Sequence, residues 1–225
     1  MYEKDTISTS KGNLVISFIG HASLMFEFNN LIIHVDPVMQ EADYAKMPKA
    51  DLIIVTHQHY DHFDLNAIKN LTKKETKLVV ANECVLSTEY LANEEVLKNG
   101  EKTSIYGINI KAVPAYNIRN KRPDGNPFHP KGVGNGYILT FGDKNVYVAG
   151  DTENIPEMKA LTNIDIAFLP MNLPYTMTPE MVADAAKAFK PKILYPYHFG
   201  NTNTQELINL LRNNTEIDVR IRDLE

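Results

Sequence analysis

The sequence predicts an α+β protein in which two β-sheets pack face to face with helices on the outside. Each half of the chain begins with short segments rich in β-branched and aromatic residues, a composition typical of strands. Each half then alternates such segments with stretches of helical character. No low-complexity segment, linker or close repeat interrupts the 225 residues, so we expect a single domain over 1–225.

Turn residues separate the strands expected in the first half. Asn29 and Asn30 predict a tight hairpin, and the Asp36-Pro37 pair ends the strand that follows it. Gly20 lies in the connection before them. The strands expected in this half are 13–19, 22–28, 31–35, 51–55 and 78–80.

Helices are expected to follow these strands. Asp64 is a plausible N-cap for a helix that ends near Leu71. Two further helices are expected at 83–91 and 94–98, the second closed by Gly100. The single cysteine, Cys84, excludes an internal disulfide framework and is expected to be a buried small hydrophobic residue.

The second half predicts further strands and a clearly delimited helix. Thr178 as N-cap, Pro179 at the first helical position and Glu180 in the first turn indicate where this helix begins. It is expected to end near Phe189, before Pro191. A last helix is expected at 205–212, and the strands expected here are 108–113, 136–141, 146–149, 164–169 and 192–195.

Composition excludes some classes of partner. A net charge of −5 argues against a large nucleic-acid footprint, which needs a basic face. The polar, acidic start has no signal-peptide character, and no apolar run is long enough to span a membrane. We therefore expect a cytoplasmic protein that acts on a small molecule. A homo-oligomer is compatible with the sequence, which does not specify the oligomeric state.

The run from Thr56 to His62 carries the strongest chemical signal. Directly after an apolar strand it contains His57, His59, Asp61 and His62, and imidazole and carboxylate are ligands that suit Zn, Fe and Mn. His57 and His59 are two residues apart, so an extended backbone places both on one side. Asp61 and His62 follow a turn and can face another point. This arrangement suits two adjacent metals; a His-rich exposed loop is the alternative.

Three other residues are candidates to complete a two-metal site. Asp151 follows a strand and Gly150, and His198 also stands just past a strand. His129 lies in the long loop 117–135, and such loops are often functional. The alternatives are a solvated turn aspartate, a core histidine and an exposed loop histidine, respectively.

Two more histidines and one aspartate could support the site. His34 and Asp36 alternate on one strand face, so both could point toward the metals. Ligating imidazoles usually donate their second N–H to an acceptor, and Asp36 is the candidate for that role. For His34 a core histidine is the favoured interpretation, and for His21 neither interpretation prevails.

These motifs together resemble the metallo-β-lactamase superfamily. The His57-x-His59-x-Asp61-His62 run matches its signature, Gly150-Asp151-Thr152 resembles its bridging-aspartate segment, and Tyr197-His198 resembles its last histidine. The remaining similarity is to a branch of uncharacterised metal-dependent hydrolases related to ascorbate-6-phosphate lactonase and N-acylphosphatidylethanolamine phospholipase. It is carried by 20–23, the Asp36-Pro37 pair and 170–177.

The resemblance implies a four-layer αββα sandwich with two metals at one edge of the sheets. It implies that His57, His59 and a third histidine hold one metal. The ligands that it implies for the other metal are Asp61, His62 and His198, with Asp151 between the two ions. The family's third histidine usually follows the strand that here ends in Tyr116-Asn117, where none stands. His129, twelve residues past Asn117, is the nearest replacement.

The mechanism expected is hydrolysis by a hydroxide shared between two divalent metal ions, Zn or Mn. Asp61 would also orient the hydroxide, and Tyr116 or Asn117 could donate to a developing oxyanion. An ester, a lactone and a phosphodiester are all compatible with such a site. The basic residues in 119–122, with Lys131, could hold an anionic substrate, and the segment 171–177 could form a pocket wall.

Three alternatives remain open at this point. A di-iron redox enzyme would typically carry a carboxylate at the position of His59 and would need a flavin domain for which this length leaves no room. A metal-dependent nuclease is disfavoured by the acidic charge. A non-catalytic binding or regulatory protein that retains the metal site is not excluded by any residue.

Overall fold

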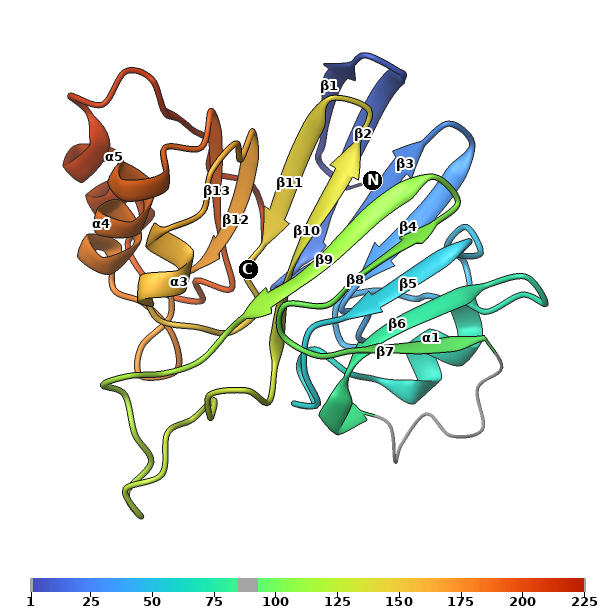
Figure 1. Ribbon diagram of the computed structural model, residues 1–225, viewed down its shortest axis with the longest axis horizontal. Coiled ribbons are helices and arrows are strands. Elements are labelled where there is room, and N and C mark those ends of the chain that lie inside the picture. Colours follow the sequence, from blue (N-terminus) through green and yellow to red (C-terminus); the bar gives the residue numbers. More distant parts are fainter. Residues whose placement is uncertain (1, 85–92, 225) are drawn as a thin grey trace.

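Two seven-stranded β-sheets pack face to face, with helices on the outer face of each (Figure 1). The computed structural model describes residues 2–84 and 93–224. Helix α1 (Leu65–Leu71) covers the first sheet, and α3 (Pro156–Lys159), α4 (Pro179–Phe189) and α5 (Thr204–Leu211) lie against the second. The order of layers is helix, sheet, sheet, helix, which confirms the predicted sandwich.

The first sheet combines a meander with a parallel segment. Its strands lie in the order in which they occur in the chain. The first four pair antiparallel, and the fourth to the seventh run parallel. The strands are β1 (Lys4–Thr9), β2 (Gly12–Gly20), β3 (Ser23–Phe28), β4 (Leu31–Val35), β5 (Leu52–Val55), β6 (Lys77–Ala81) and β7 (Glu94–Leu97).

The second sheet repeats the same pattern of pairing. Strands β8 to β11 are antiparallel, and β11 to β14 run parallel. The two halves of the chain therefore share one topology, although the sequence shows no close repeat. The strands are β8 (Lys102–Ile105), β9 (Ile108–Pro114), β10 (Asn135–Phe141), β11 (Lys144–Val148), β12 (Ile166–Pro170), β13 (Ile193–Tyr197) and β14 (Asp218–Val219).

The predicted turns and caps are confirmed. Asn29 and Asn30 both have positive φ, 50° and 64°, as a two-residue hairpin turn of this type requires. Asp64 caps α1 by accepting hydrogen bonds from two backbone N–H groups of its first turn. Thr178 accepts from the N–H of Met181 at 3.2 Å to cap α4. Among the described residues, no helix has the length and apolar character needed to cross a membrane.

Apolar side chains fill the space between the sheets and the space under α1. Along β5, Leu52 and Ile54 belong to the core between the sheets, whereas Ile53 and Val55 pack under α1. Both faces of this strand are covered, which explains its unbroken apolar sequence. The buried strand β5 thus anchors the start of the loop that begins at Thr56.

Two helix predictions need correction or lie partly outside the structure. The segment expected as a helix at 94–98 is strand β7, which pairs parallel with β6. Pairing with the neighbouring strand outweighs the moderate helix propensity of Glu and Leu in so short a run. Of the helix expected at 83–91, Asn82–Cys84 forms a 3-10 turn with Cys84 buried, and 85–92 lie outside the described residues. Strands β1, β8 and β14 and helix α3 are additions to the prediction.

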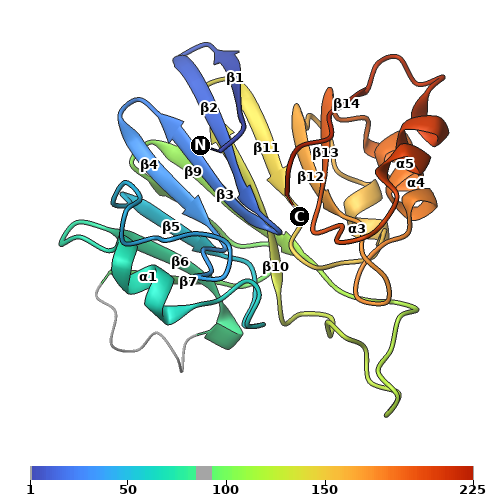
Figure 2. The ribbon, with the colours of Figure 1, turned by 180° about the vertical axis from the view of Figure 1, so that it is seen from behind.

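A partly buried ion-pair cluster ties β1 of the first sheet to the chain's last strands. The Asp5 carboxylate accepts hydrogen bonds from Arg222 at 2.8 Å, Arg220 at 3.0 Å and the Tyr195 hydroxyl. Figure 2 shows the C-terminal segment running back from β14 to the vicinity of β1. Burial alone would raise the pKa of Asp5, but the bonds from Tyr195 and Arg222 hold that pKa below its ordinary value.

Replacement of Asp5 by asparagine should lower the free energy of unfolding by about 2 kcal/mol at neutral pH, because charge-assisted bonds to a carboxylate are lost. Urea unfolding measures this. The folded-state pKa is lowered, so the benefit is present above the unfolded value of 3.8 and declines as the pH falls below it. The control Asp43→Asn, in an exposed pair with Lys46, should leave the free energy of unfolding essentially unchanged. Equal effects of the two variants would contradict this role.

Candidate metal centre

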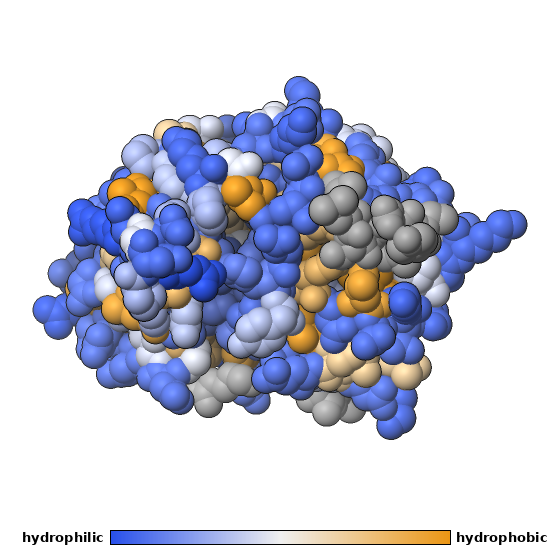
Figure 3. All heavy atoms as spheres, turned by 90° about the horizontal axis from the view of Figure 1, so that it is seen from below, coloured by the Kyte–Doolittle hydropathy of each residue, from blue (hydrophilic) through white to orange (hydrophobic). Residues whose placement is uncertain are grey.

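Residues that follow the parallel strands of both sheets meet at one edge of the sandwich. Asp36 follows β4, the run from Thr56 to His62 follows β5, Asp151 follows β11 and His198 follows β13. The carboxyl ends of parallel strands are a frequent position for functional loops. Figure 3 views the molecule from below and shows apolar side chains interspersed among hydrophilic ones.

One group of four metal-binding side chains consists of His57, His59, His129 and Asp151. The Nδ1 atom of His59 lies 3.2 Å from His57 Nε2 and 3.1 Å from His129 Nε2. His129 Nε2 is also 3.2 Å from Asp151 Oδ2. His129 therefore reaches the site from the long loop, in the position predicted for a displaced third histidine.

A second group of four lies beside the first and consists of His21, Asp61, His62 and His198. Asp61 Oδ2 is 3.4 Å from His21 Nε2 and 3.5 Å from His198 Nε2. The rings of His62 and His198 are stacked, with centroids 5.2 Å apart. The turn after His59 separates Asp61 and His62 from the first group, as the sequence predicts, and the structure adds His21.

Asp151 lies between the two groups. Its Oδ1 atom is 3.3 Å from His62 Nε2, while its Oδ2 atom is 3.2 Å from His129 Nε2 and 3.4 Å from His198 Nε2. The carboxylate is nearly fully buried. One oxygen of Asp151 thus faces the second group and the other contacts both, the placement expected of a bridging ligand.

Asp36 supports the cluster from behind. Its fully buried carboxylate accepts from the Thr56 N–H at 2.8 Å, the Thr56 hydroxyl at 2.7 Å and His62 Nδ1 at 2.8 Å. This confirms the role predicted for Asp36. His34, by contrast, is a core histidine: its Nε2 contacts the Pro48 carbonyl at 3.2 Å, and burial lowers its pKa to about 4.

The outer hydrogen bonds fix which ring nitrogen of three histidines faces the cluster. His62 donates from Nδ1 to Asp36, and His129 donates from Nδ1 to the Asn117 side-chain oxygen at 2.8 Å. The Thr56 hydroxyl gives its proton to Asp36, so it accepts from His57 Nδ1 at 3.0 Å. In the neutral rings each Nε2 atom then presents a lone pair to the cluster.

Three site residues adopt a left-handed backbone at the ends of their strands. The φ angles of His21, Asp36 and His198 are 50°, 46° and 47°. Non-glycine residues rarely adopt this conformation, and it concentrates at functional sites. Gly150, with φ of 63°, is required next to Asp151 because a Cβ atom there would lie 2.7 Å from the Asn135 carbonyl oxygen.

Burial and repulsion from neighbouring imidazoles lower the pKa of His57 and of His59. Burial, reinforced by the charge of His62, holds the pKa of His57 well below its ordinary value, and burial lowers the pKa of His59 to about 4. For His62, burial opposes the charged form, but Asp151 and Asp36 together hold its pKa well above normal. Burial likewise raises the pKa of Asp151, yet the surrounding imidazoles outweigh it and hold that pKa well below normal.

The predicted oxyanion donors have other contacts. The Tyr116 hydroxyl donates to Glu157 at 2.9 Å and accepts from Lys131 at 3.3 Å, and Tyr116 lines neither cavity at the site. The Asn117 amide donates to the Tyr175 carbonyl at 2.9 Å while its oxygen orients His129. In these contacts Asn117 positions the side chain of His129, and Tyr116 ties down the base of the loop.

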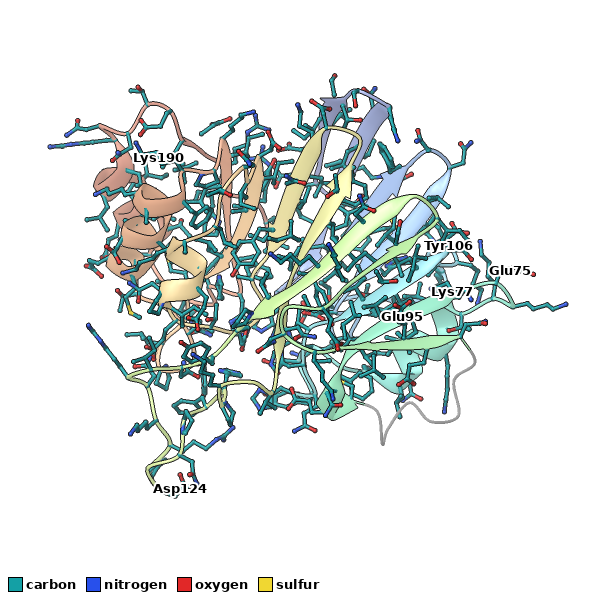
Figure 4. The ribbon with its side chains drawn as sticks, in the orientation of Figure 1. Glu75, Lys77, Glu95, Tyr106, Asp124 and Lys190 are labelled. Atoms are coloured by element: carbon teal, nitrogen blue, oxygen red, sulfur yellow. The ribbon has the colours of Figure 1, made fainter. Side chains whose placement is uncertain are left out.

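A cleft of about 450 Å³ opens over the second group, and a smaller cavity of about 90 Å³ adjoins the first. Arg122 lines the cleft with its guanidinium 5.0 Å from the centre of the Phe128 ring. Asn172 and Tyr175 also line the cleft, so the segment 171–177 does contribute to a pocket wall. Figure 4 shows Asp124, near Arg122, at the outer tip of the same loop.

Comparisons with known proteins identify the family. A profile described as "Beta-lactamase superfamily domain" matches residues 15–198. The chain belongs to the β-lactamase superfamily. A superfamily relative from Nanoarchaeum equitans, named a UPF0173 metal-dependent hydrolase, is 30% identical over 187 residues, covering 82% of this chain and 83% of its own.

Two solved structures have a similar fold. A crystal structure from Parabacteroides distasonis, whose name describes a metal-dependent hydrolase, is 48% identical to this chain. The alignment covers 100% of both chains, with a TM-score of 0.93. Igni18, a metallo hydrolase from Ignicoccus hospitalis, is 23% identical, with coverage of 94% and 96% and a TM-score of 0.76. The second similarity concerns the fold alone.

Asp36→Asn should lower the free energy of unfolding by about 3 kcal/mol, because it breaks a buried set of charge-assisted bonds while keeping side-chain volume. Urea unfolding in the presence of a chelator measures this without any contribution from metal. Asp124→Asn, at an exposed loop tip, is the matched control and should change stability little. An Asp36 variant as stable as the parent would show that the network does not hold the site together.

Proposed function

We propose that this protein is a metal-dependent hydrolase that holds two divalent ions, Zn or Mn, and cleaves an ester, lactone or phosphodiester bond of a small substrate. The observation that carries the proposal is the convergence of unprotonated ring nitrogens described above. His57 and His129 both direct Nε2 at His59 Nδ1, at 3.2 and 3.1 Å. These three nitrogen atoms can share at most one proton. A metal cation between them would therefore satisfy their lone pairs better than hydrogen bonds do.

The donor set fits metal ions in two further respects. The buried atoms His62 Nε2, His198 Nε2 and Asp151 Oδ1 have no hydrogen-bond partner among the described residues. Buried polar atoms are rarely left unsatisfied, and such exceptions call for an unseen partner. Donors bound to one ion at about 2.1 Å in a tetrahedral arrangement lie about 3.4 Å apart, close to the distances in the first group.

The proposed ligands of the first ion are His57, His59 and His129. Asp61, His62 and His198 are proposed for the second, with Asp151 between the ions. Both sets combine imidazole nitrogens with carboxylates and are compatible with Zn and with Mn, which geometry would distinguish. Both sets are intact, which supports a catalytic protein over one that has lost its chemistry.

Bound divalent ions would supply a water activated at neutral pH and positive charge for the developing oxyanion. The residues of the chain orient that chemistry. Burial raises the pKa of Asp61, but the nearby rings of His198 and His21 outweigh it and hold that pKa below its ordinary value, so this carboxylate stays ionised. Its side chain is 30% exposed at the cleft, and it can accept a hydrogen bond from an attacking water.

The cleft supports a small and anionic substrate. Its volume of about 450 Å³ is in the range of small-molecule sites. Arg122 lines it, whereas Lys131 is paired with Glu157 at 2.7 Å and does not. A guanidinium beside an aromatic wall can bind a carboxylate or phosphate through two bonds at once. Of the basic residues considered from the sequence, Arg122 is therefore the proposed anion-binding residue.

His129→Ala should reduce the metal content from two ions per chain toward one. The variant removes one of three nitrogen ligands of the first ion, so the remaining set binds weakly. Elemental analysis of the gently purified protein measures this. Lys131→Ala is the matched control in the same loop and should keep two ions. One ion or none in the parent, unchanged in His129→Ala, would contradict the two-metal proposal.

Arg122→Ala should raise KM for an anionic ester or phosphodiester about tenfold or more and leave kcat for a neutral ester unchanged, because charge-assisted bonds to the substrate are lost. Steady-state kinetics on matched anionic and neutral substrates measure the difference. Lys121→Ala, which changes the neighbouring charge, controls for general electrostatics. Equal losses for both substrates in Arg122→Ala would contradict recognition of an anion.

A further inference from the structure

We propose that His21 is a direct ligand of the second ion and that this ligand makes the second site prefer metals with six ligands over zinc. The inference rests on the proposed two-metal function. It adds a residue that is not among the ligands implied by the resemblance to the metallo-β-lactamase superfamily. It concerns how this chain selects its metal.

The backbone holds His21 in place at the edge of the cluster. His21 directly follows β2 and has a φ angle of 50°, which turns its side chain away from the strand direction. Its N–H donates to the Leu224 carbonyl at 3.0 Å, and its carbonyl accepts from the His198 N–H at 3.0 Å. The second bond joins the β2 end of the first sheet directly to a residue of the second group.

The ring of His21 faces the second group with an unsatisfied nitrogen. Its Nε2 atom is buried, has no hydrogen-bond partner among the described residues and lies 3.4 Å from Asp61 Oδ2. The ring centroid is 3.9 Å from that of His198. Two donors of one ion with bonds of about 2.0–2.2 Å can lie at most about 4.4 Å apart, so the Nε2–Oδ2 distance fits a shared ion.

The two proposed metal sites differ in the number of ligands that the protein supplies. The first ion has three imidazoles and Asp151, whereas the second would have His21 in addition to Asp61, His62 and His198, and Asp151 as well. Five protein donors and one water make six ligands. Zinc in proteins is mostly four-coordinate, while Mn and related ions accept six nitrogen and oxygen ligands. The second site should therefore discriminate against zinc.

Cobalt is a suitable probe because its visible absorption is weak with six ligands and intense with four. The metal-free full-length protein is titrated with Co²⁺, with affinity from calorimetry and coordination from the spectrum. His21→Asn keeps a residue that tolerates positive φ, and His21→Gly is a second variant without that strain. Tyr60→Ala, an 81% exposed residue of the same cleft that offers no ligand, is the control.

The parent should bind two Co²⁺ ions, and both His21 variants should bind the second about tenfold or more weakly with a stronger visible band. Their preference should also shift from Mn²⁺ toward Zn²⁺ in competition. Weaker binding with an unchanged band would overturn the proposal, since His21 would then only position Asp61. Unchanged affinity in both variants would overturn it as well and leave the two-metal function standing. A parent that binds a single Co²⁺ would overturn both.

Discussion

The buried carboxylate of Asp36 is the interaction on which the geometry of the site depends. It binds the backbone and side chain of Thr56 and the ring of His62, and through Thr56 it also fixes His57. A charge at zero exposure is costly unless each lone pair is satisfied, and here the donors that satisfy it are the site's own elements. The free-energy cost of burying this carboxylate is therefore offset only when the rings of His57 and His62 are correctly oriented.

The fold places the other metal-binding side chains by repeating one structural arrangement. A buried strand ends, the backbone takes a left-handed conformation or a glycine follows, and a polar side chain turns into the space between the sheets. His21, Asp36 and His198 follow this rule directly, and Gly150 does so for Asp151. The strands that precede these residues end in buried positions, and such a scaffold can hold the strained residues in place.

The sequence predicts those features that are local. The caps of α1 and α4, the Asn29-Asn30 turn and the metal-binding character of the run from Thr56 to His62 depend on neighbouring residues, and the pattern of strands and helices along the chain indicates the sandwich. His129 could be proposed from its place in a long loop and from the resemblance, but its approach to the site depends on hydrogen bonds with Asn117 that fold the loop back. The place of His21 and the contacts of Tyr116 depend on residues far apart in the chain, with Leu224 as one example. Strand β7 was missed for the same reason, because its partner β6 decides its conformation.

The metal-binding side chains are unequally divided between the two halves of the chain, although the halves share one topology. The first half, up to β7, carries five donor residues, and the second, from β8, carries His129, Asp151 and His198. Neither half holds a complete set for either group. A chain cut near Gly100, between the halves, would give two fragments that could each form a sheet but no centre. Recovery of metal binding on mixing them would then report the docking of one sheet on the other, which makes the centre a sensor of the assembly of its own fold.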